Sequence, residues 1–188
     1  PGGVESGPAV YNGTVYVGRL DGNISAWNAA TGADVWRFRT SARASSAPAV
    51  SNGRVIVETD NWNLFSLDAT TGAKVWDGRN SSSGWDGSVV TQSDPAVAYG
   101  KVYLGGEYNV YAFDELTGAQ LYNYHINGVS LDAAPAVADG IVYITTTGGS
   151  PDLSGGNAIY ALDADDLTLR WVNHTPANSV MLASPAVA

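Results

Sequence analysis

Apolar and polar residues alternate along this chain in short segments that are separated by glycine-containing turns. Residues 64–68 read Leu-Phe-Ser-Leu-Asp, residues 110–114 read Val-Tyr-Ala-Phe-Asp, and an apolar run such as 55–57 precedes each segment of this kind. Alternation with a period of two is the pattern of a half-buried β-strand. The pattern therefore predicts short antiparallel strands along the chain, and no segment has the apolar spacing of an amphipathic helix.

The tripeptide Pro-Ala-Val occurs five times, beginning at residues 8, 48, 95, 135 and 185, so the chain repeats itself every 40 to 50 residues. Each of the first four copies is followed at a fixed distance by a glycine: Gly13, Gly53, Gly100 and Gly140. Three of these glycines form Asn-Gly or Asp-Gly pairs, which are strong signals for a tight hairpin. Self-similarity at this period indicates a repeat architecture.

Each repeat contains four predicted strands, and four short strands per repeat are typical of a propeller blade. We predict an all-β fold, a β-propeller segment spanning residues 1–188 with four four-stranded antiparallel blades at about residues 8–40, 48–80, 95–126 and 135–174. The fifth Pro-Ala-Val predicts the start of a fifth blade at 184–188, which has no place in a closed ring of four. We therefore expect an open arc of a ring of about seven or eight blades, with further chain on both sides, because an open blade exposes unpaired strand edges.

The turn between the third and fourth strands has its own signature. Asp68 ends a predicted strand, Thr71 and Gly72 follow it, and Trp76 stands eight residues after it. The same offset of eight residues separates Trp36 from Asn28 in the first repeat and Trp171 from Asp163 in the fourth. An Asp or Asn at such a place accepts hydrogen bonds from amides two residues on, and Gly supplies a positive φ. We predict that Trp36, Trp76 and Trp171 are mostly buried between blades. The third repeat has Tyr122 instead, and residues 163–168 lack the glycine, so that turn must be built differently.

These residues resemble the PQQ-like β-propeller repeat family, whose hallmark is Ala-Leu-Asp, then Ala-x-Thr-Gly, then a Trp about eight residues after the Asp. Residues 67–72 with Trp76 match it closely, and residues 27–32 with Trp36 differ mainly at Asn28. The resemblance covers essentially the whole chain and implies the fold. It implies less about function, since members include quinoprotein dehydrogenases, the lipoprotein of the outer-membrane β-barrel assembly machinery and sensor domains of bacterial kinases. Dehydrogenases of the family hold the quinone under an adjacent cysteine pair, and this chain has no Cys.

Composition narrows the classes of function. The formal net charge is −9, which disfavours nucleic acid and anionic membrane surfaces as partners. No run of apolar residues is long enough for a membrane span. The only histidines, His125 and His174, lie in different repeats. We therefore predict no catalytic residue, no cofactor and no metal site in this segment.

Strand order predicts where a site would lie. The connections between the second and third strands, and those between successive repeats, share one face, and they carry the variation in length. Binding residues concentrate on variable loops held by a rigid scaffold. The candidate ligand or partner residues on this face are Asp21, Asp60, Trp62, Trp85, Asp86, Glu107, Tyr108 and Asp152. Carboxylates with aromatic rings suit a cation, a sugar or a basic peptide; the alternative is that they are solvated loop residues.

The sequence favours a non-catalytic module for binding or assembly, placed outside the cytoplasm, in the periplasm, in the medium or on the cell surface. Its expected partners are a protein or carbohydrate on the variable-loop face and the remaining blades of the same propeller. The first alternative is a fragment of a PQQ-dependent quinoprotein dehydrogenase whose catalytic residues lie outside this segment. The second is a structural repeat of a cell-surface assembly.

Overall fold

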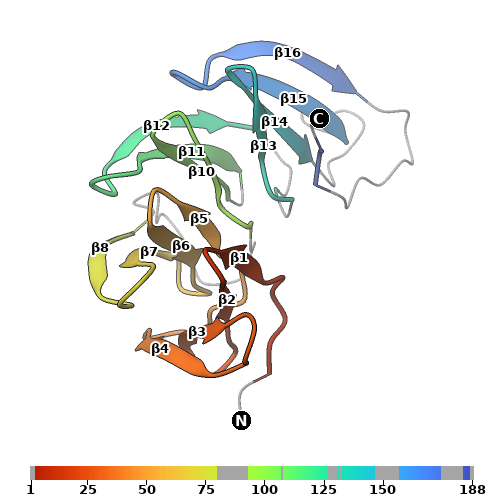
Figure 1. The fold of residues 1–188 in the computed structure, drawn as a ribbon. Coiled ribbons are helices and arrows are strands. Elements are labelled where there is room, and N and C mark those ends of the chain that lie inside the picture. The colour runs from red at the N-terminus through yellow and green to blue at the C-terminus, as the bar shows by residue number, and fades with distance from the viewer. Residues whose placement is uncertain are drawn as a thin grey trace. The chain divides into compact units, whose positions relative to one another are not determined.

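The computed structural model describes residues 3–79, 93–106, 108–126, 131, 133–146, 157–174 and 184–186. These residues form strands, turns and bends, without a helix, and the strands make four four-stranded antiparallel sheets (Figure 1). The strands are β1 (Ala9–Tyr11), β2 (Thr14–Gly18), β3 (Asn23–Asn28), β4 (Asp34–Arg39), β5 (Ala49–Ser51), β6 (Arg54–Glu58), β7 (Asn63–Asp68), β8 (Lys74–Arg79), β9 (Ala96–Ala98), β10 (Lys101–Gly105), β11 (Asn109–Asp114), β12 (Gln120–His125), β13 (Ala136–Ala138), β14 (Ile141–Thr146), β15 (Ala158–Asp163) and β16 (Leu169–His174).

Each sheet is built from four strands that are consecutive in the chain, in the order in which they occur. This arrangement confirms the predicted all-β fold and is consistent with part of a β-propeller. The division into blades at the predicted residue limits, with a fifth blade beginning at 184–188, stays a prediction. The chain divides into two compact units, residues 1–86 with the first two sheets and residues 87–188 with the other two. That the sheets form an open arc of a larger ring stays a prediction.

The hairpin between the first two strands of each sheet has the predicted turn chemistry. Asn12 has φ 46° and Gly13 has φ 70°, and the equivalent pairs in the other three sheets also have positive φ at both residues. Two consecutive positive φ values define the type I′ turn, whose twist matches that of antiparallel strands. Tyr99 adopts this conformation (φ 53°) where the other repeats have Asn or Asp.

The turn between β7 and β8 shows why Asp ends the third strand. One carboxylate oxygen of Asp68 accepts hydrogen bonds from the amides of Thr70 (3.0 Å) and Thr71 (2.7 Å) and from the Thr71 hydroxyl (2.8 Å). These donors stabilise the ionised form, so the Thr71 hydroxyl above all holds the pKa of Asp68 below its ordinary value. Asn28 accepts the same three hydrogen bonds in the first sheet. We refer to this segment, from the Asp or Asn to the glycine four residues later, as the C–D turn.

In the first unit, two aromatic side chains of one sheet hold the C–D turn of the next. The Tyr16 hydroxyl and the Trp36 indole N–H both donate to the backbone oxygen of Ala69, at 3.0 and 2.9 Å. The Trp36 ring lies so close to Gly72 that a Cβ there would meet it at 2.6 Å. Both aromatic residues are buried, at 2% and 9% exposure. Glycine is therefore required at this turn for its positive φ of 71° and for the close approach of the ring.

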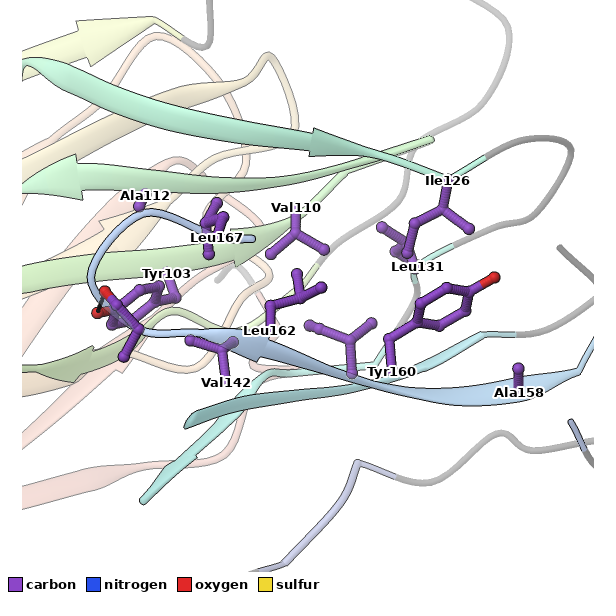
Figure 2. Close-up of a cluster of buried hydrophobic side chains, with 12 residues drawn as sticks. Tyr103, Val110, Ala112, Ile126, Leu131, Val142, Ala158, Tyr160, Leu162 and Leu167 are labelled. Carbon is purple, nitrogen blue, oxygen red and sulfur yellow. Dashed lines mark hydrogen bonds between the residues drawn. The ribbon is translucent and has the colours of Figure 1, made fainter. Parts of the chain in front are cut away.

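In the second unit, the buried cluster joins the third and fourth sheets (Figure 2). The Tyr103 hydroxyl donates to the backbone oxygen of Ala164 at 2.7 Å, which repeats the contact of Tyr16 with Ala69. Burial raises the pKa of the Tyr103 phenol well above its ordinary value.

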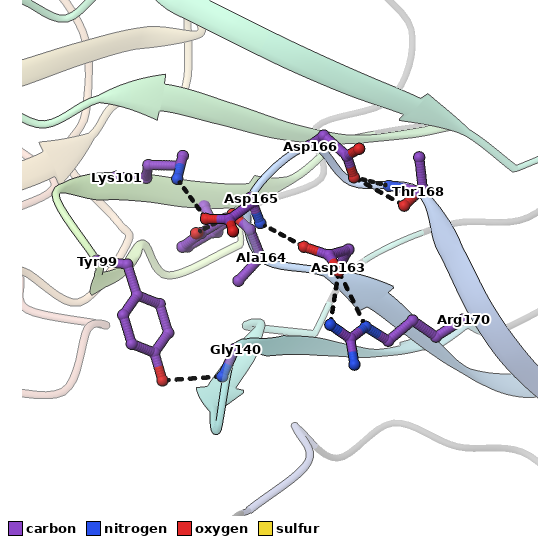
Figure 3. Close-up of polar contacts among 10 residues, drawn as sticks. Tyr99, Lys101, Gly140, Asp163, Ala164, Asp165, Asp166, Thr168 and Arg170 are labelled. Atoms are coloured by element: carbon purple, nitrogen blue, oxygen red, sulfur yellow. Dashed lines mark hydrogen bonds and ion pairs between the residues drawn. The ribbon is translucent and has the colours of Figure 1, made fainter.

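The fourth C–D turn has leucine in place of glycine, and the prediction that this turn must be built differently is wrong for its backbone. Its side-chain hydrogen bonds do differ, since the Thr168 hydroxyl donates to Asp166 at 2.7 Å (Figure 3). The Leu167 amide donates to the Asp163 carbonyl at 2.9 Å, the bond that Gly72 makes with Asp68. Leu167 has φ 61° and is 1% exposed, within the cluster that contains Val110 and Ala112 of the third sheet. Figure 2 shows its side chain beside these two residues. Leucine thus adopts a left-handed conformation here and fills space between two sheets.

The predicted burial of the tryptophans on the fourth strand of a sheet is confirmed for Trp36 and for Trp76, which is 8% exposed. It is wrong for Trp171, which is 45% exposed. Trp36 is covered by the C–D turn of the sheet that follows it. Within the described residues, no C–D turn packs on Trp171, so a large part of its ring faces solvent. Tyr122 is also 40% exposed, in the repeat that precedes the leucine-containing turn.

Candidate functional site

The β2–β3 loop holds Asp21 in a defined position. Arg19 forms an ion pair with Asp21 at 2.9 Å, and the Asn23 amide and carboxamide nitrogens donate to the other Asp21 oxygen at 3.1 and 2.8 Å. Gly22, at φ 80°, closes the loop by donating to the Arg19 carbonyl at 3.1 Å. Asp21 is therefore a positioned, half-buried carboxylate rather than a freely solvated one.

The segment between β4 and β5 connects the β2–β3 and β6–β7 loops. Its Ala44 amide donates to the Arg19 carbonyl at 3.0 Å, and its Arg43 carbonyl accepts from the Asp60 amide at 2.9 Å. The Ser45 hydroxyl of the same segment donates to the Asp60 carboxylate. Asp21 and Asp60 thus lie on two loops that are bonded to one segment, at the same end of the first unit.

Trp62 occupies the position of Gly22 in the second sheet. Its amide donates to the Thr59 carbonyl at 2.8 Å, as Gly22 does to Arg19, and its φ is 63°. The left-handed conformation costs a residue with a Cβ roughly 1–2 kcal/mol relative to glycine. Strained positions of this kind concentrate at functional sites. Trp62 is half-buried, so its ring contributes to packing as well as to the surface.

In the second unit, Tyr108 stands beside His125. Tyr108 is 40% exposed, its ring centroid is 6.4 Å from that of His125, and its carbonyl accepts from the Ile126 amide at 2.7 Å. A His125 ring nitrogen is 3.2 Å from the Asn109 carboxamide oxygen. These contacts join the β10–β11 loop to the end of β12 and form an exposed aromatic and amide cluster.

The two histidines are members of a repeated position that the sequence reasoning missed. Each of the four outermost strands ends in a basic residue: Arg39, Arg79, His125 and His174. In the first three sheets, this residue pairs in register with an Asn. The constant spacing of three residues after the aromatic residue of the fourth strand could have revealed it. The position recurs in every sheet, which indicates a framework role for it.

Four of the predicted site residues lie outside the described residues: Trp85, Asp86, Glu107 and Asp152. In the part of the chain that the structure describes, no group of three or more His, Asp or Glu side chains could hold a metal ion. No helix among the described residues is long and apolar enough to cross a membrane. That the chain takes no metal or cofactor stays a prediction.

The repeated four-stranded sheets, their type I′ hairpins and their C–D turns define a β-propeller repeat protein of the PQQ-like class. The chain belongs to the family described as outer membrane protein assembly factor BamB, whose sequence model matches residues 2–130 and 82–188. No curated protein sequence matches the chain.

Solved structures agree with this assignment at the level of the fold. BamB from Moraxella catarrhalis is 23% identical, with a TM-score of 0.74, and the match covers 90% of this chain and 52% of that one. The quinohemoprotein alcohol dehydrogenase ADHIIG from Pseudomonas putida HK5 is 20% identical, with a TM-score of 0.82, and the match covers 93% of this chain and 34% of that one. The quinohemoprotein alcohol dehydrogenase from Comamonas testosteroni is 23% identical, with a TM-score of 0.78, covering 92% of this chain and 35% of that one. The chain thus spans about half the length of the BamB structure, and the identities support a shared fold alone.

Proposed function

We propose that this chain is a non-catalytic binding and assembly module that acts outside the cytoplasm and contacts its partner through the loops that carry Asp21, Asp60, Trp62 and Tyr108. The matching family is described as an outer membrane protein assembly factor, which supports an assembly role and an extracytoplasmic location. The remaining blades of the same propeller complete the scaffold, since the matched structures extend well beyond the matched part.

The observation that carries the proposal is the conformation of Trp62. The first sheet uses glycine at this place, and the backbone geometry is the same, so tryptophan is not needed to build the loop. A large aromatic ring retained at a conformational cost, between hydrogen-bonded polar side chains, is suited to stack on a sugar ring or to pack on an apolar side chain of a protein. The neighbouring carboxylates of Asp21 and Asp60 supply hydrogen-bond acceptors of fixed position.

The test compares two aromatic residues that share this strain. Trp62→Gly introduces the residue of the first repeat on the candidate face, and Tyr99→Asn introduces the residue of the first two repeats at the type I′ hairpins, which lie at the other end of the sheets. Two probes represent the two partner classes: a panel of neutral oligosaccharides, and an unfolded outer-membrane β-barrel polypeptide held in dilute urea. We expect one probe to bind the wild-type chain, with at least about a tenfold loss for Trp62→Gly and no change for Tyr99→Asn, since removing a central aromatic contact costs 2 kcal/mol or more. Equal binding by both variants would contradict the role of this face.

The alternative is that this chain is a fragment of a quinoprotein dehydrogenase. Its fold is compatible with this alternative, because the TM-score to a quinohemoprotein alcohol dehydrogenase is 0.82. It predicts saturable binding of pyrroloquinoline quinone with calcium, measured by quenching of tryptophan fluorescence. The non-catalytic proposal predicts no saturable quenching by this cofactor.

A further inference from the structure

We infer that Asn12 is an N-glycosylation site, at which an oligosaccharide is attached to the hairpin between β1 and β2 and its first sugar packs on the Tyr11 ring. The inference rests on the location outside the cytoplasm proposed above, because N-linked sugars are carried by exported proteins. It assigns a covalent modification to the end of the first sheet that lies away from the loop carrying Asp21.

The structure separates Asn12 from a second candidate with the same sequence signal. The Asn-x-Ser/Thr spacing of an acceptor occurs four times, at residues 12–14, 23–25, 80–82 and 173–175, and the last two segments extend outside the described residues. The Asn23 carboxamide donates to Asp21 at 2.8 Å, and Ser25 is 0% exposed, so this segment is committed to the fold. Asn12 is exposed, and no hydrogen bond within the described residues holds its carboxamide.

The place of Asn12 stays accessible when another sheet packs beside it. Asn52 and Asp139 occupy the same place in the second and fourth sheets, and each of these sheets packs on the preceding sheet of its own unit. Both residues are exposed despite that neighbour. A blade that precedes the first sheet would therefore leave the Asn12 side chain open to solvent, because this hairpin turn lies at the end of the strands and outside the packed face.

The turn places an aromatic ring and a hydroxyl beside the acceptor. Tyr11 and Thr14 are directly paired across β1 and β2, so their side chains lie on one face of the sheet. Asn12 begins the type I′ turn between them, and Tyr11 is 37% exposed. A sugar on Asn12 thus lies within reach of the Tyr11 ring, whose face suits the C–H groups of a sugar. The same turn of the second sheet is flanked by Ser51 and Arg54 and lacks both features.

The modification transfers an oligosaccharide from a lipid pyrophosphate carrier, which is its co-substrate. The Asn12 Nδ2 forms a bond to the anomeric carbon of the first sugar, and the bond from that carbon to the pyrophosphate oxygen breaks. The lipid pyrophosphate leaves with the electron pair of the broken bond, and one amide proton passes to the transferase. Thr14 supplies the hydroxyl that the transferase requires two residues after the Asn.

The experiment maps the full-length protein, isolated from the cells that make it, by mass spectrometry of its peptides. The peptides are compared before and after treatment with an amidase that removes N-linked sugars and converts the linked Asn to Asp. We expect the peptide with Asn12 to carry sugar and to show the Asn-to-Asp mass change after the amidase, and the peptide with Asn23 to be unmodified.

Cell fractionation keeps this inference distinct from the proposed function. An unmodified Asn12 in protein recovered from outside the cytoplasm would overturn the inference and leave the proposed location standing. Recovery of the protein from the cytoplasm alone would overturn the location and the inference together, through a measurement that does not depend on the sugar.

Variants exported from a host that N-glycosylates proteins test the acceptor. Thr14→Val should abolish the modification, and Thr14→Ser should restore it in part, since the serine keeps the hydroxyl. Asn12→Asp should also abolish it and keep the turn, because Asp-Gly stands at this place in the fourth sheet. Sugar that remains on the first hairpin in Thr14→Val would overturn the assignment.

Urea unfolding of the glycosylated and the unglycosylated chain tests the contact with Tyr11. The sugar should lower the unfolding equilibrium constant of the wild type about threefold or more, as a contact with an aromatic ring does. Tyr11→Ser introduces the residue of the second sheet; it should keep the sugar and lose this stabilisation. Arg54→Thr is the matched control: it creates the acceptor spacing at Asn52 without a preceding aromatic ring, so sugar there should not stabilise. Equal stabilisation in Tyr11→Ser would contradict the packing of the sugar on the ring.

Discussion

The leucine at residue 167 gives the sharpest test of how these blades pack. Gly72 and Leu167 stand at the same place in two C–D turns, with positive φ and the same hydrogen bond to the residue four positions back. Over Gly72 lies the Trp36 ring, whereas Leu167 follows a repeat in which Tyr122 is 40% exposed. We interpret the Leu167 side chain as filling the space that the tryptophan ring fills in the first unit. The prediction is that Leu167→Gly destabilises the protein although it removes an unfavourable backbone conformation.

The magnitude follows from two opposed terms. Returning a left-handed residue to glycine is worth roughly 1–2 kcal/mol. Removing a leucine side chain that is 1% exposed costs about 2–5 kcal/mol, through lost burial and the cavity left behind. The net loss should be about 1–3 kcal/mol. Adding a side chain at the equivalent glycine of the second sheet, as in Gly72→Ala, should also destabilise the protein. The new Cβ would lie 2.6 Å from the Trp36 ring, and overpacking of this kind costs about 1–3 kcal/mol.

The assay is urea unfolding followed by circular dichroism, with the midpoint and slope compared at constant pH. The variant Tyr122→Trp combined with Leu167→Gly supplies both the ring and the glycine of the first unit. We expect the free energy of unfolding of this double variant to exceed the value expected from adding the two single changes by about 1 kcal/mol or more. Substitutions at residues in contact are not additive in their effects on stability. If Leu167→Gly were as stable as wild type, or if the two changes were additive, the ring and the leucine would not share one space.

Three further outcomes follow from the same contacts. Trp36→Ala should cost about 3–5 kcal/mol in urea unfolding, as buried aromatic truncations do, while Val35→Ala, at a residue 47% exposed, should stay within about 0.5 kcal/mol of wild type. Tyr103→Phe should lower the free energy of unfolding by about 1–3 kcal/mol, because the buried Ala164 carbonyl loses its hydrogen-bond donor. A melting temperature equal to that of the wild type would contradict a stabilising role of this hydrogen bond. Asp68→Asn should reduce the loss of stability on acidification: the depressed pKa of Asp68 gives stability above pH about 4 that disappears as pH falls through the folded-state pKa. An unchanged acid dependence of the unfolding midpoint would contradict this assignment.

The sequence determined the local structure because its signals act over a few residues. Positive φ at Gly13 and at its equivalents follows from the Asn-Gly and Asp-Gly pairs, and the hydrogen bonds of Asp68 follow from the Asp-x-x-Thr-Gly spacing. Period-two alternation marked the third strand of each repeat, which the structure has as β3, β7, β11 and β15. The repeat also located the two loops that carry Asp21 and Asp60.

Tertiary structure decided which repeated residues are buried, since burial depends on what the next sheet presents. Trp36 and Trp171 have the same spacing in the sequence, yet Trp36 is 9% exposed beneath the C–D turn of the next sheet, whereas Trp171 is 45% exposed in the part of the chain that the structure describes. Trp62 and Leu167 both adopt a left-handed backbone conformation that favours glycine, and the Leu167 side chain is buried as well. Local propensity favours glycine at both places, and at Leu167 the burial of the side chain in the cluster with Val110 and Ala112 opposes that preference.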